Sequence, residues 1–317
     1  LEKYFGEYPW AKEKIGIAAV PNSGMEHQTM ITFQNKFNYT KIGVHDYSAN
    51  LYHEYGHEWF ANKVTNKDWA HMWIQEGITT YSEALIHYEL GGQEAYDEII
   101  SRHKRNTRNK KPMVGGEELS EDEAYAGRDI YAKGSFFMHS LRYVLGDEIF
   151  LPTLKKLATD PRYTYDNFVT TKDVEELFST ASKQDLKPFF NFYVYTNEVL
   201  DISVKEVGYQ KYQITVNNFF MPLPLDIGPA DKTTRTMVGK EGIVVFSNGA
   251  PQVDPKGHYL KKITKQANQK IGKKDVYFFG LSPQGKLGYG CSWHPNIKQH
   301  EYNAEELYAF LLPLINQ

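Results

Sequence analysis

The chain has 317 residues, a formal net charge of -3 and a hydrophobic content of 41%, so it is long enough for more than one domain with a sizeable core. This charge balance argues against nucleic acid as the main partner, and the basic run at residues 102–111 is more typical of a solvated helix end and loop. The single cysteine, Cys291, excludes an intrachain disulfide.

No run of about 18 apolar residues is present, so the sequence predicts a soluble protein without a membrane-spanning helix. The lack of disulfides fits the cytoplasm, and it fits the periplasm or secretion equally well if a signal peptide precedes Leu1. The compartment and the oligomeric state are left open by the sequence.

Two predicted strands flank a short loop near the N-terminus. Residues 15–20 and 30–33 have the apolar and β-branched composition of strands. The segment between them contains Ser-Gly-Met-Glu-His at residues 23–27.

A metal-binding pattern follows in a segment predicted to be helical, residues 51–60. His53, Glu54 and His57 form H-E-x-x-H, and positions i and i+4 of a helix lie on one face, so both imidazoles can reach one metal ion. Glu76, after 18 intervening residues, opens another helical stretch and supplies a third ligand. A catalytic zinc site has three protein ligands and one open position. The alternative is an amphipathic helix with solvated histidines, which the downstream glutamate disfavours.

Helical patterns dominate residues 51–192, with apolar residues at three-to-four spacing and breaks at glycine and proline. The predicted helices after the metal motif cover residues 82–90, 95–104, 134–145, 150–158 and 171–179, the last with a threonine cap at Thr170.

After residue 200, the spacing of apolar residues changes from that of helices to the alternation typical of strands. Residues 201–207, 211–216 and 241–246 alternate, and prolines lie in the connections, so residues 200–260 are predicted to form a small β-sandwich. Residues 261–317 form a mixed α/β segment without an assigned function, with a predicted strand at 275–279 and a helix at 304–314.

These motifs together resemble the gluzincin zinc aminopeptidases of the aminopeptidase N family (family M1). H-E-x-x-H, 18 residues and then W-x-x-E-G at residues 73–77 match the family's zinc motif. Residues 23–27 resemble its G-x-M-E-N exopeptidase motif, and residues 131–134 resemble its Y-x-K-G motif. The resemblance covers roughly residues 1 to 200.

The resemblance implies an α+β protein whose residues 1–199 are a thermolysin-like, mainly helical catalytic domain, followed by the β-domain found in many relatives. In the family an N-terminal β-domain precedes the catalytic domain. We therefore expect this chain to be a fragment with a truncated start, which lacks that domain.

The chemistry assigns a role to each metal-site residue. His53, His57 and Glu76 would hold one zinc ion per chain, and Glu54 would act as the general base toward the bound water. By resemblance, Tyr131 donates a hydrogen bond to the oxyanion. Metal-bound histidines usually donate their second N–H to another group, and Thr80 or Glu83 could serve; a packing or solvated role is equally open for both.

Glu26, by resemblance, pairs with the free α-ammonium group of a peptide substrate. Gly24 and Met25 match the same motif and would let the loop backbone run close to the bound peptide. Ser23 and His27 depart from the family's glycine and asparagine, which affects the expected shape of the amino-terminus pocket.

The resulting hypothesis is a zinc metallopeptidase, most simply an aminopeptidase that hydrolyses N-terminal residues from peptides with free N-termini. One alternative is another hydrolase on the same zinc site, against which Glu26 argues. The other is a catalytically inactive scaffold, against which the intact ligand set argues. The preferred N-terminal residue is not encoded in any one motif.

Overall fold

The computed structural model describes residues 1–21, 24–34, 38–116, 118–208, 211–228, 234–246 and 252–253. The chain divides into two compact units, Leu1–Glu198 and Val199–Gln317, which are treated separately below. The segment predicted as mixed α/β, residues 261–317, lies outside the described residues.

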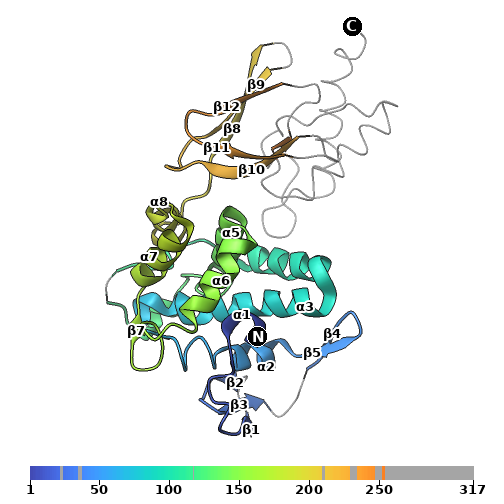
Figure 1. The fold of residues 1–317 in the computed structure, drawn as a ribbon, viewed down its shortest axis with the longest axis vertical. Coiled ribbons are helices and arrows are strands. Elements are labelled where there is room, and N and C mark those ends of the chain that lie inside the picture. The colour runs from blue at the N-terminus through green and yellow to red at the C-terminus, as the bar shows by residue number, and fades with distance from the viewer. Residues whose placement is uncertain are drawn as a thin grey trace. The chain divides into compact units, whose positions relative to one another are not determined.

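The first unit is mainly helical. Its helices are α1 (Glu2–Phe5), α2 (Ala49–Gly56), a short 3-10 helix η1 (Trp69–His71), α3 (Met72–Asn106), α4 (Glu121–Tyr125), α5 (Ala132–Leu145), α6 (Asp147–Leu157), α7 (Thr171–Ser182) and α8 (Lys187–Tyr195). Figure 1 shows α3 between two groups of elements, with α5 to α8 on one side and α2 with the N-terminal strands on the other.

The strands of this unit form small sheets: β1 (Gly16–Val20), β2 (Gly24–Met25), β3 (Met30–Gln34), β4 (Thr40–Ile42), β5 (His45–Tyr47), β6 (Thr65–Asn66) and β7 (Phe168–Val169). The first sheet has the order β1-β3-β2, with β1 parallel and β2 antiparallel to β3. Ile31 and Phe33 of β3 are buried, which anchors the sheet to the core. Strand β2 ends at Met25, immediately before Glu26.

Helix boundaries follow local chemistry, and three predictions about them are confirmed. The break expected between residues 90 and 95 is a kink within α3 at Gly92, whose φ of 70° is favourable only for glycine. α7 starts with the predicted cap, because Thr170 and Asp173 form a reciprocal capping box. The basic run spans the end of α3 and the loop after it, as expected.

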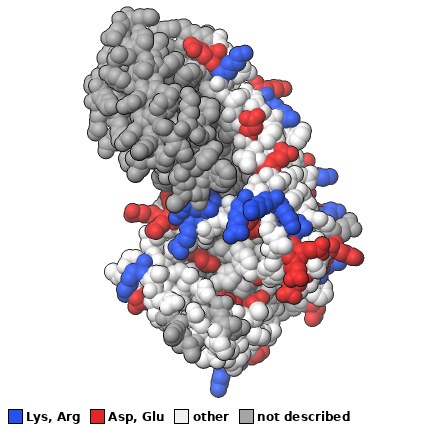
Figure 2. Space-filling view, turned by 180° about the vertical axis from the view of Figure 1, so that it is seen from behind, with Lys and Arg blue, Asp and Glu red and all other residues white. Residues whose placement is uncertain are grey.

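The surface carries charges of both signs. Arg102, Arg105 and Arg108 are exposed at and beyond the end of α3. On the face drawn in Figure 2, Lys and Arg side chains lie among Asp and Glu side chains rather than forming a surface of one sign. Among the described residues, no helix combines the length and the apolar character needed to cross a membrane.

The core of the first unit lies between α3 and α5. Trp73, Ile78, Tyr81 and Leu85 of α3 are fully buried. The Trp73 ring meets the ring of Phe137 from α5 edge-on, with centroids 5.2 Å apart. This apolar contact is one of those through which the two helices pack.

Two glycines determine how close α3 and α5 come. A Cβ added to Gly77 would lie 2.8 Å from the Cα of Gly134, and a Cβ added to Gly134 would lie 2.7 Å from the Cα of Gly77. The helices thus touch backbone to backbone at this crossing. Gly77 directly follows Glu76, and Gly134 lies three residues after Tyr131, so the crossing brings these two side chains to one place.

The second unit, as described, consists of strands: β8 (Ile202–Gly208), β9 (Lys211–Val216), β10 (Leu223–Gly228), β11 (Thr234–Val238), β12 (Ile243–Phe246) and β13 (Gln252–Val253). They form two three-stranded sheets with the orders β12-β9-β8 and β11-β10-β13. Tyr212, Ile214 and Val216 alternate as buried residues along β9, as in a strand with one covered face. The predicted β-sandwich of residues 200–260 remains a prediction.

Gly77→Ala should destabilise the first unit. Alanine favours a helix over glycine by about 1 kcal/mol, but overpacking a well-packed contact costs about 1–3 kcal/mol, and here the obstacle is backbone, which cannot rotate away. The difference of these two terms is a net loss of up to about 2 kcal/mol, which denaturant unfolding would measure. Gly239→Ala, where the nearest atoms would lie 3.6–3.9 Å away, is the neutral control. A Gly77→Ala protein as stable as the parent would contradict the close crossing.

Candidate metal and substrate site

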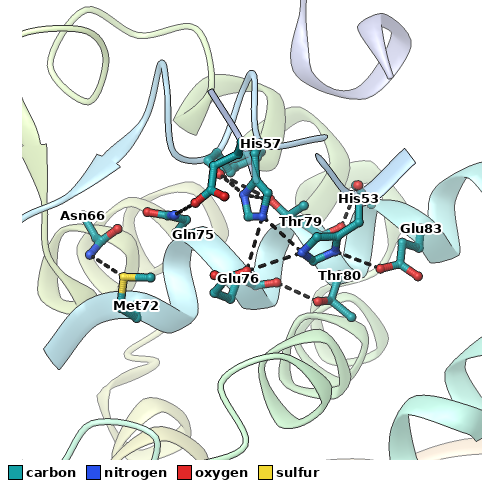
Figure 3. A network of polar contacts seen from close by, with 12 residues as sticks. His53, His57, Asn66, Met72, Gln75, Glu76, Thr79, Thr80 and Glu83 are labelled. Atoms are coloured by element: carbon teal, nitrogen blue, oxygen red, sulfur yellow. Dashed lines mark hydrogen bonds and ion pairs between the residues drawn. The ribbon is translucent and has the colours of Figure 1, made fainter. Parts of the chain in front are cut away.

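Three predicted ligand side chains converge between α2 and α3 (Figure 3). His53 Nε2 and His57 Nε2 lie 3.1 Å apart. Glu76 Oε2 lies 3.4 Å from His53 Nε2 and 3.3 Å from His57 Nε2. Both His57 and Glu76 are buried. The pattern identified in the sequence therefore corresponds to one compact cluster.

The helix that carries the histidines is shorter than predicted. α2 ends at Gly56, and His57 is its C-terminal cap, still in the right-handed helical region and donating its N–H to His53 O. The imidazoles stay one turn apart, so the early end does not disturb the pair. Gly56 has a packing function, because an added Cβ would lie 2.9 Å from Ser82 Oγ and 3.1 Å from Thr79 Cγ2 of α3.

The second nitrogen of each imidazole is already engaged. His53 Nδ1 lies 3.0 Å from Glu83 Oε1, and His57 Nδ1 lies 2.9 Å from the carbonyl oxygen of Phe60. A carboxylate and a carbonyl only accept hydrogen bonds, so both Nδ1 atoms donate. In neutral imidazoles the two Nε2 lone pairs then face each other and Glu76 Oε2, which has no hydrogen bond from any described residue.

This donor set fits a divalent cation. Two lone pairs and a carboxylate oxygen repel one another unless a proton or a metal ion lies between them. Burial opposes a charge on His53, but the carboxylates of Glu76 and Glu83 outweigh it and raise the pKa of His53 to about 10, so the site attracts positive charge. Two imidazole nitrogens and one carboxylate oxygen are a ligand set of catalytic zinc sites, and the Nδ1 contacts are the supporting contacts that such histidines make.

Glu83 and Thr80, the two candidates for a hydrogen bond to the histidines, make different contacts. Glu83 contacts His53, whereas Thr80 donates its hydroxyl to the backbone oxygen of Glu76 at 2.7 Å. Thr79, which the sequence did not single out, has its Oγ1 3.1 Å from His57 Nδ1. The helical period correctly places Glu83 on the histidine side of α3.

Glu54 lies beside the metal ligands. Carboxylate oxygens of Glu26 and Glu54 and a ring nitrogen of His57 all lie within 4.8 Å of one another. Burial raises the pKa of Glu54 above its usual value, opposed by the nearby histidines. A Cβ added to Gly24 would lie 2.7 Å from Glu54 Oε1, so the Glu54 side chain occupies the space left by that glycine.

Glu26 is held from α3. Gln75 Nε2 donates to Glu26 Oε1 at 2.7 Å. This contact joins the loop after β2 to α3, one residue before Glu76. Met25 is 47% exposed and lies next to Glu26 on the edge strand β2. His27 Nδ1 lies 3.4 Å from Thr32 Oγ1, so it contacts the neighbouring strand. Ser23 lies outside the described residues.

Two tyrosines complete the cluster. The ring of Tyr131, at the N-terminus of α5, has its centroid 5.9 Å from that of His53 and 6.2 Å from that of Tyr125. Burial, followed by the Glu76 carboxylate, raises the pKa of Tyr131, so its phenol remains a hydrogen-bond donor at neutral pH. Tyr125 OH donates to Glu76 Oε1 at 3.3 Å. The sequence analysis missed Tyr125, since it is one of 23 tyrosines and lies in no motif considered there.

The fold and the cluster define a metallopeptidase-like architecture, and a family comparison agrees with it. Residues 1–193 match the peptidase family M1 domain, which is more than half of the 317 residues. The chain belongs to peptidase family M1, and the predicted membership of the aminopeptidase N family is confirmed.

Similar proteins include several aminopeptidases. Aminopeptidase 2, mitochondrial, of Saccharomyces cerevisiae is 24% identical over 310 residues, covering 86% of this chain and 32% of that protein. Aminopeptidase B of Mus musculus is 29% identical over 162 residues, covering 46% of this chain and 24% of that protein. The chain spans about a third or less of the length of these relatives.

Solved structures share the fold. The M1 zinc metallopeptidase of Deinococcus radiodurans matches with a TM-score of 0.53 and 23% identity, over 66% of this chain and 44% of that one. Aminopeptidase A of Legionella pneumophila in complex with aspartic acid matches with a TM-score of 0.62 and 20% identity, over 89% of this chain and 38% of that one. The likeness supports an α+β fold of the M1 peptidase kind.

Zinc affinity should depend on Glu83. Removing a carboxylate that orients a metal-bound histidine typically lowers metal affinity by about 10–100-fold, so we expect Glu83→Ala to weaken zinc binding by this factor. Competition with a chelating indicator measures it. Glu94→Ala, on the exposed face of the same helix, is the matched control and should bind zinc like the parent. Equal affinity of the Glu83→Ala and Glu94→Ala proteins would show that Glu83 does not support the metal site.

Proposed function

We propose that this chain is the catalytic part of a zinc aminopeptidase that removes N-terminal residues from peptides with free N-termini. In this proposal residues 1–199 are a thermolysin-like catalytic domain that holds one zinc ion, and residues 200–260 are a β-sandwich. The observation that carries it is the convergence of two clusters that share His57, one formed with His53 and Glu76, the other with Glu26 and Glu54.

The proposed metal ligands are His53, His57 and Glu76. When bound there, zinc would supply a Lewis acid that lowers the pKa of a water and polarises a peptide carbonyl. Glu83 keeps the proton on His53 Nδ1, so that the Nε2 lone pair faces the metal position. The buried carboxylate of Glu76 balances part of the metal charge.

Glu54 is the proposed general base. Its carboxylate lies beside His57, and burial raises its pKa toward the operating pH, where proton transfer in both directions is most effective. It would accept the proton of the attacking water and deliver it to the nitrogen of the leaving amine.

Tyr131 is the proposed donor to the oxyanion that forms when the carbonyl is attacked. Its ring centroid lies 5.9 Å from that of His53, and a protonated phenol adds no charge to the site in the ground state. The crossing of α3 and α5 at Gly77 and Gly134 fixes its place relative to Glu76.

Glu26 is the proposed partner of the substrate's α-ammonium group. The carboxylate lies close enough to Glu54 and His57 for a peptide anchored at its N-terminus to present its first peptide bond at the metal. Gly24 and Met25 form the adjoining strand edge along which such a peptide would run. The aminopeptidase names of the relatives support this assignment.

Glu54→Gln should retain zinc and lose turnover. The amide fills the same space but cannot accept a proton, so we expect kcat to fall by at least ~10². Steady-state kinetics with zinc content measured on the same samples tests this. A near-normal rate in zinc-loaded Glu54→Gln protein would contradict the assigned role.

Glu26→Ala should selectively impair substrates with a free N-terminus. A hydrogen bond to a charged group in a shielded site is worth about 1.5–3 kcal/mol, so kcat/KM should fall at least about tenfold. The parent protein should hydrolyse an N-acetylated peptide far more slowly than the free one. If the parent cleaved blocked and free peptides equally well, the site would belong to another kind of zinc hydrolase.

A further inference from the structure

The contact between Gln75 and Glu26 links two parts of the site that are far apart in sequence. Gln75 Nε2 donates to Glu26 Oε1 at 2.7 Å, across 49 positions of the chain. Gln75 directly precedes the ligand Glu76 in α3, and Figure 3 shows the two side by side below His57. The amide therefore connects the loop carboxylate to the helix that positions the metal.

The same loop is attached a second time, next to His57. Thr29 N donates to Glu58 Oε1 at 2.9 Å, and Asn62 Nδ2 donates to Glu58 Oε2 at 3.2 Å. Glu58 is fully buried, so its position is fixed by packing. Thr29 has a φ of 59°, a conformation that a β-branched residue adopts only when its surroundings hold it there. Both attachments fasten the loop to the segments that carry the metal ligands.

Gln75 supports Glu26 without cancelling its charge. A carboxylate has two oxygens, each with more than one acceptor position, so a single amide donor leaves it able to bind a cation. A lysine or arginine at this position would pair with Glu26 and compete with an ammonium group. A neutral donor therefore orients the carboxylate and leaves its charge available to a cation.

We propose that Gln75 is a positioning residue that holds the Glu26 carboxylate at a fixed distance from the metal ligands and so sets the place where a bound peptide is cut. The inference rests on the proposed function, since it acts through the pairing of Glu26 with the substrate's α-ammonium group. Without the amide, Glu26 keeps its charge but samples other rotamers, and the ammonium is bound less well.

The test is a double-mutant cycle in zinc-loaded protein. Gln75→Met keeps the length of the side chain and removes the donor, so we expect kcat/KM for a free-N-terminus dipeptide p-nitroanilide to fall by about tenfold, mainly through KM. In the Glu26→Ala background, the same substitution should have no further effect, because the group it positions is gone. Zinc content should be unchanged throughout.

Gln93→Met is the matched control. Gln93 lies on the same helix and donates to Asp97 at 2.8 Å at an exposed position, so the substitution removes the same kind of contact away from the site. It should leave kcat/KM unaltered. Gln75→Asn, whose amide is one methylene shorter, should behave like Gln75→Met and provides a second variant if that protein does not fold.

Two results would overturn the proposal. If Gln75→Met lowered kcat/KM equally in the parent and in Glu26→Ala, Gln75 would act independently of Glu26. If Gln75→Met and Gln75→Asn matched the Gln93→Met control while Glu26→Ala showed its expected loss, the contact would have no effect on substrate binding. In the second case the proposed function would still stand, so the two failures are distinguishable.

Discussion

The site depends on one electrostatic requirement, that two imidazole nitrogens and a carboxylate oxygen meet in a buried space. Their Nε2 atoms are 3.1 Å apart, and Glu76 Oε2 lies within 3.4 Å of both, an arrangement that is unfavourable unless a proton or a metal ion supplies positive charge. The lone pairs of His53 and His57 face inward because Glu83 and the Phe60 carbonyl take up the opposite nitrogens. The hydrogen bonds made by the two Nδ1 atoms thus leave the Nε2 lone pairs available to a metal ion.

Glycines allow the helices to bring these groups together. Gly56 lets α2 lie against Ser82 and Thr79 of α3, and Gly77 meets Gly134 where α3 crosses α5. Each glycine lies one to three residues from a side chain of the site, so a small change in helix separation would move a ligand or Tyr131 directly. In these helices, glycine serves close packing rather than flexibility, which outweighs its lower helix propensity.

That His53 and His57 lie together was predictable because their spacing is one helical turn. Glu76 lies on another helix, and it was predicted as the third ligand from the motif downstream. Glu83 was one of two candidates, with Thr80, that the helical period of α3 offered for contact with the histidines.

The end of α2 at Gly56 was not predictable from the sequence, because the apolar pattern continues past it through Trp59 and Phe60. Both of these residues are fully buried. Sequence periodicity reports burial, and here burial extends beyond the helix. Tyr125 and Gln75 were missed because each contacts a residue 49 positions away, a pairing that only the tertiary fold creates.

The balance of charge in the proposed complex couples the metal to the substrate. Three carboxylates, those of Glu26, Glu54 and Glu76, lie around His57, and a fourth, that of Glu83, contacts His53 Nδ1. Histidines that bind a metal ion through Nε2 would be neutral. A divalent cation offsets two of the charges around His57 and a peptide ammonium offsets the third. A blocked N-terminus would leave one carboxylate without a counter-charge in a partly buried site, which is unfavourable. In the proposed function, a preference for free N-termini would follow from the three carboxylates around His57, among which Glu26 would bind the ammonium group and Gln75 would orient Glu26.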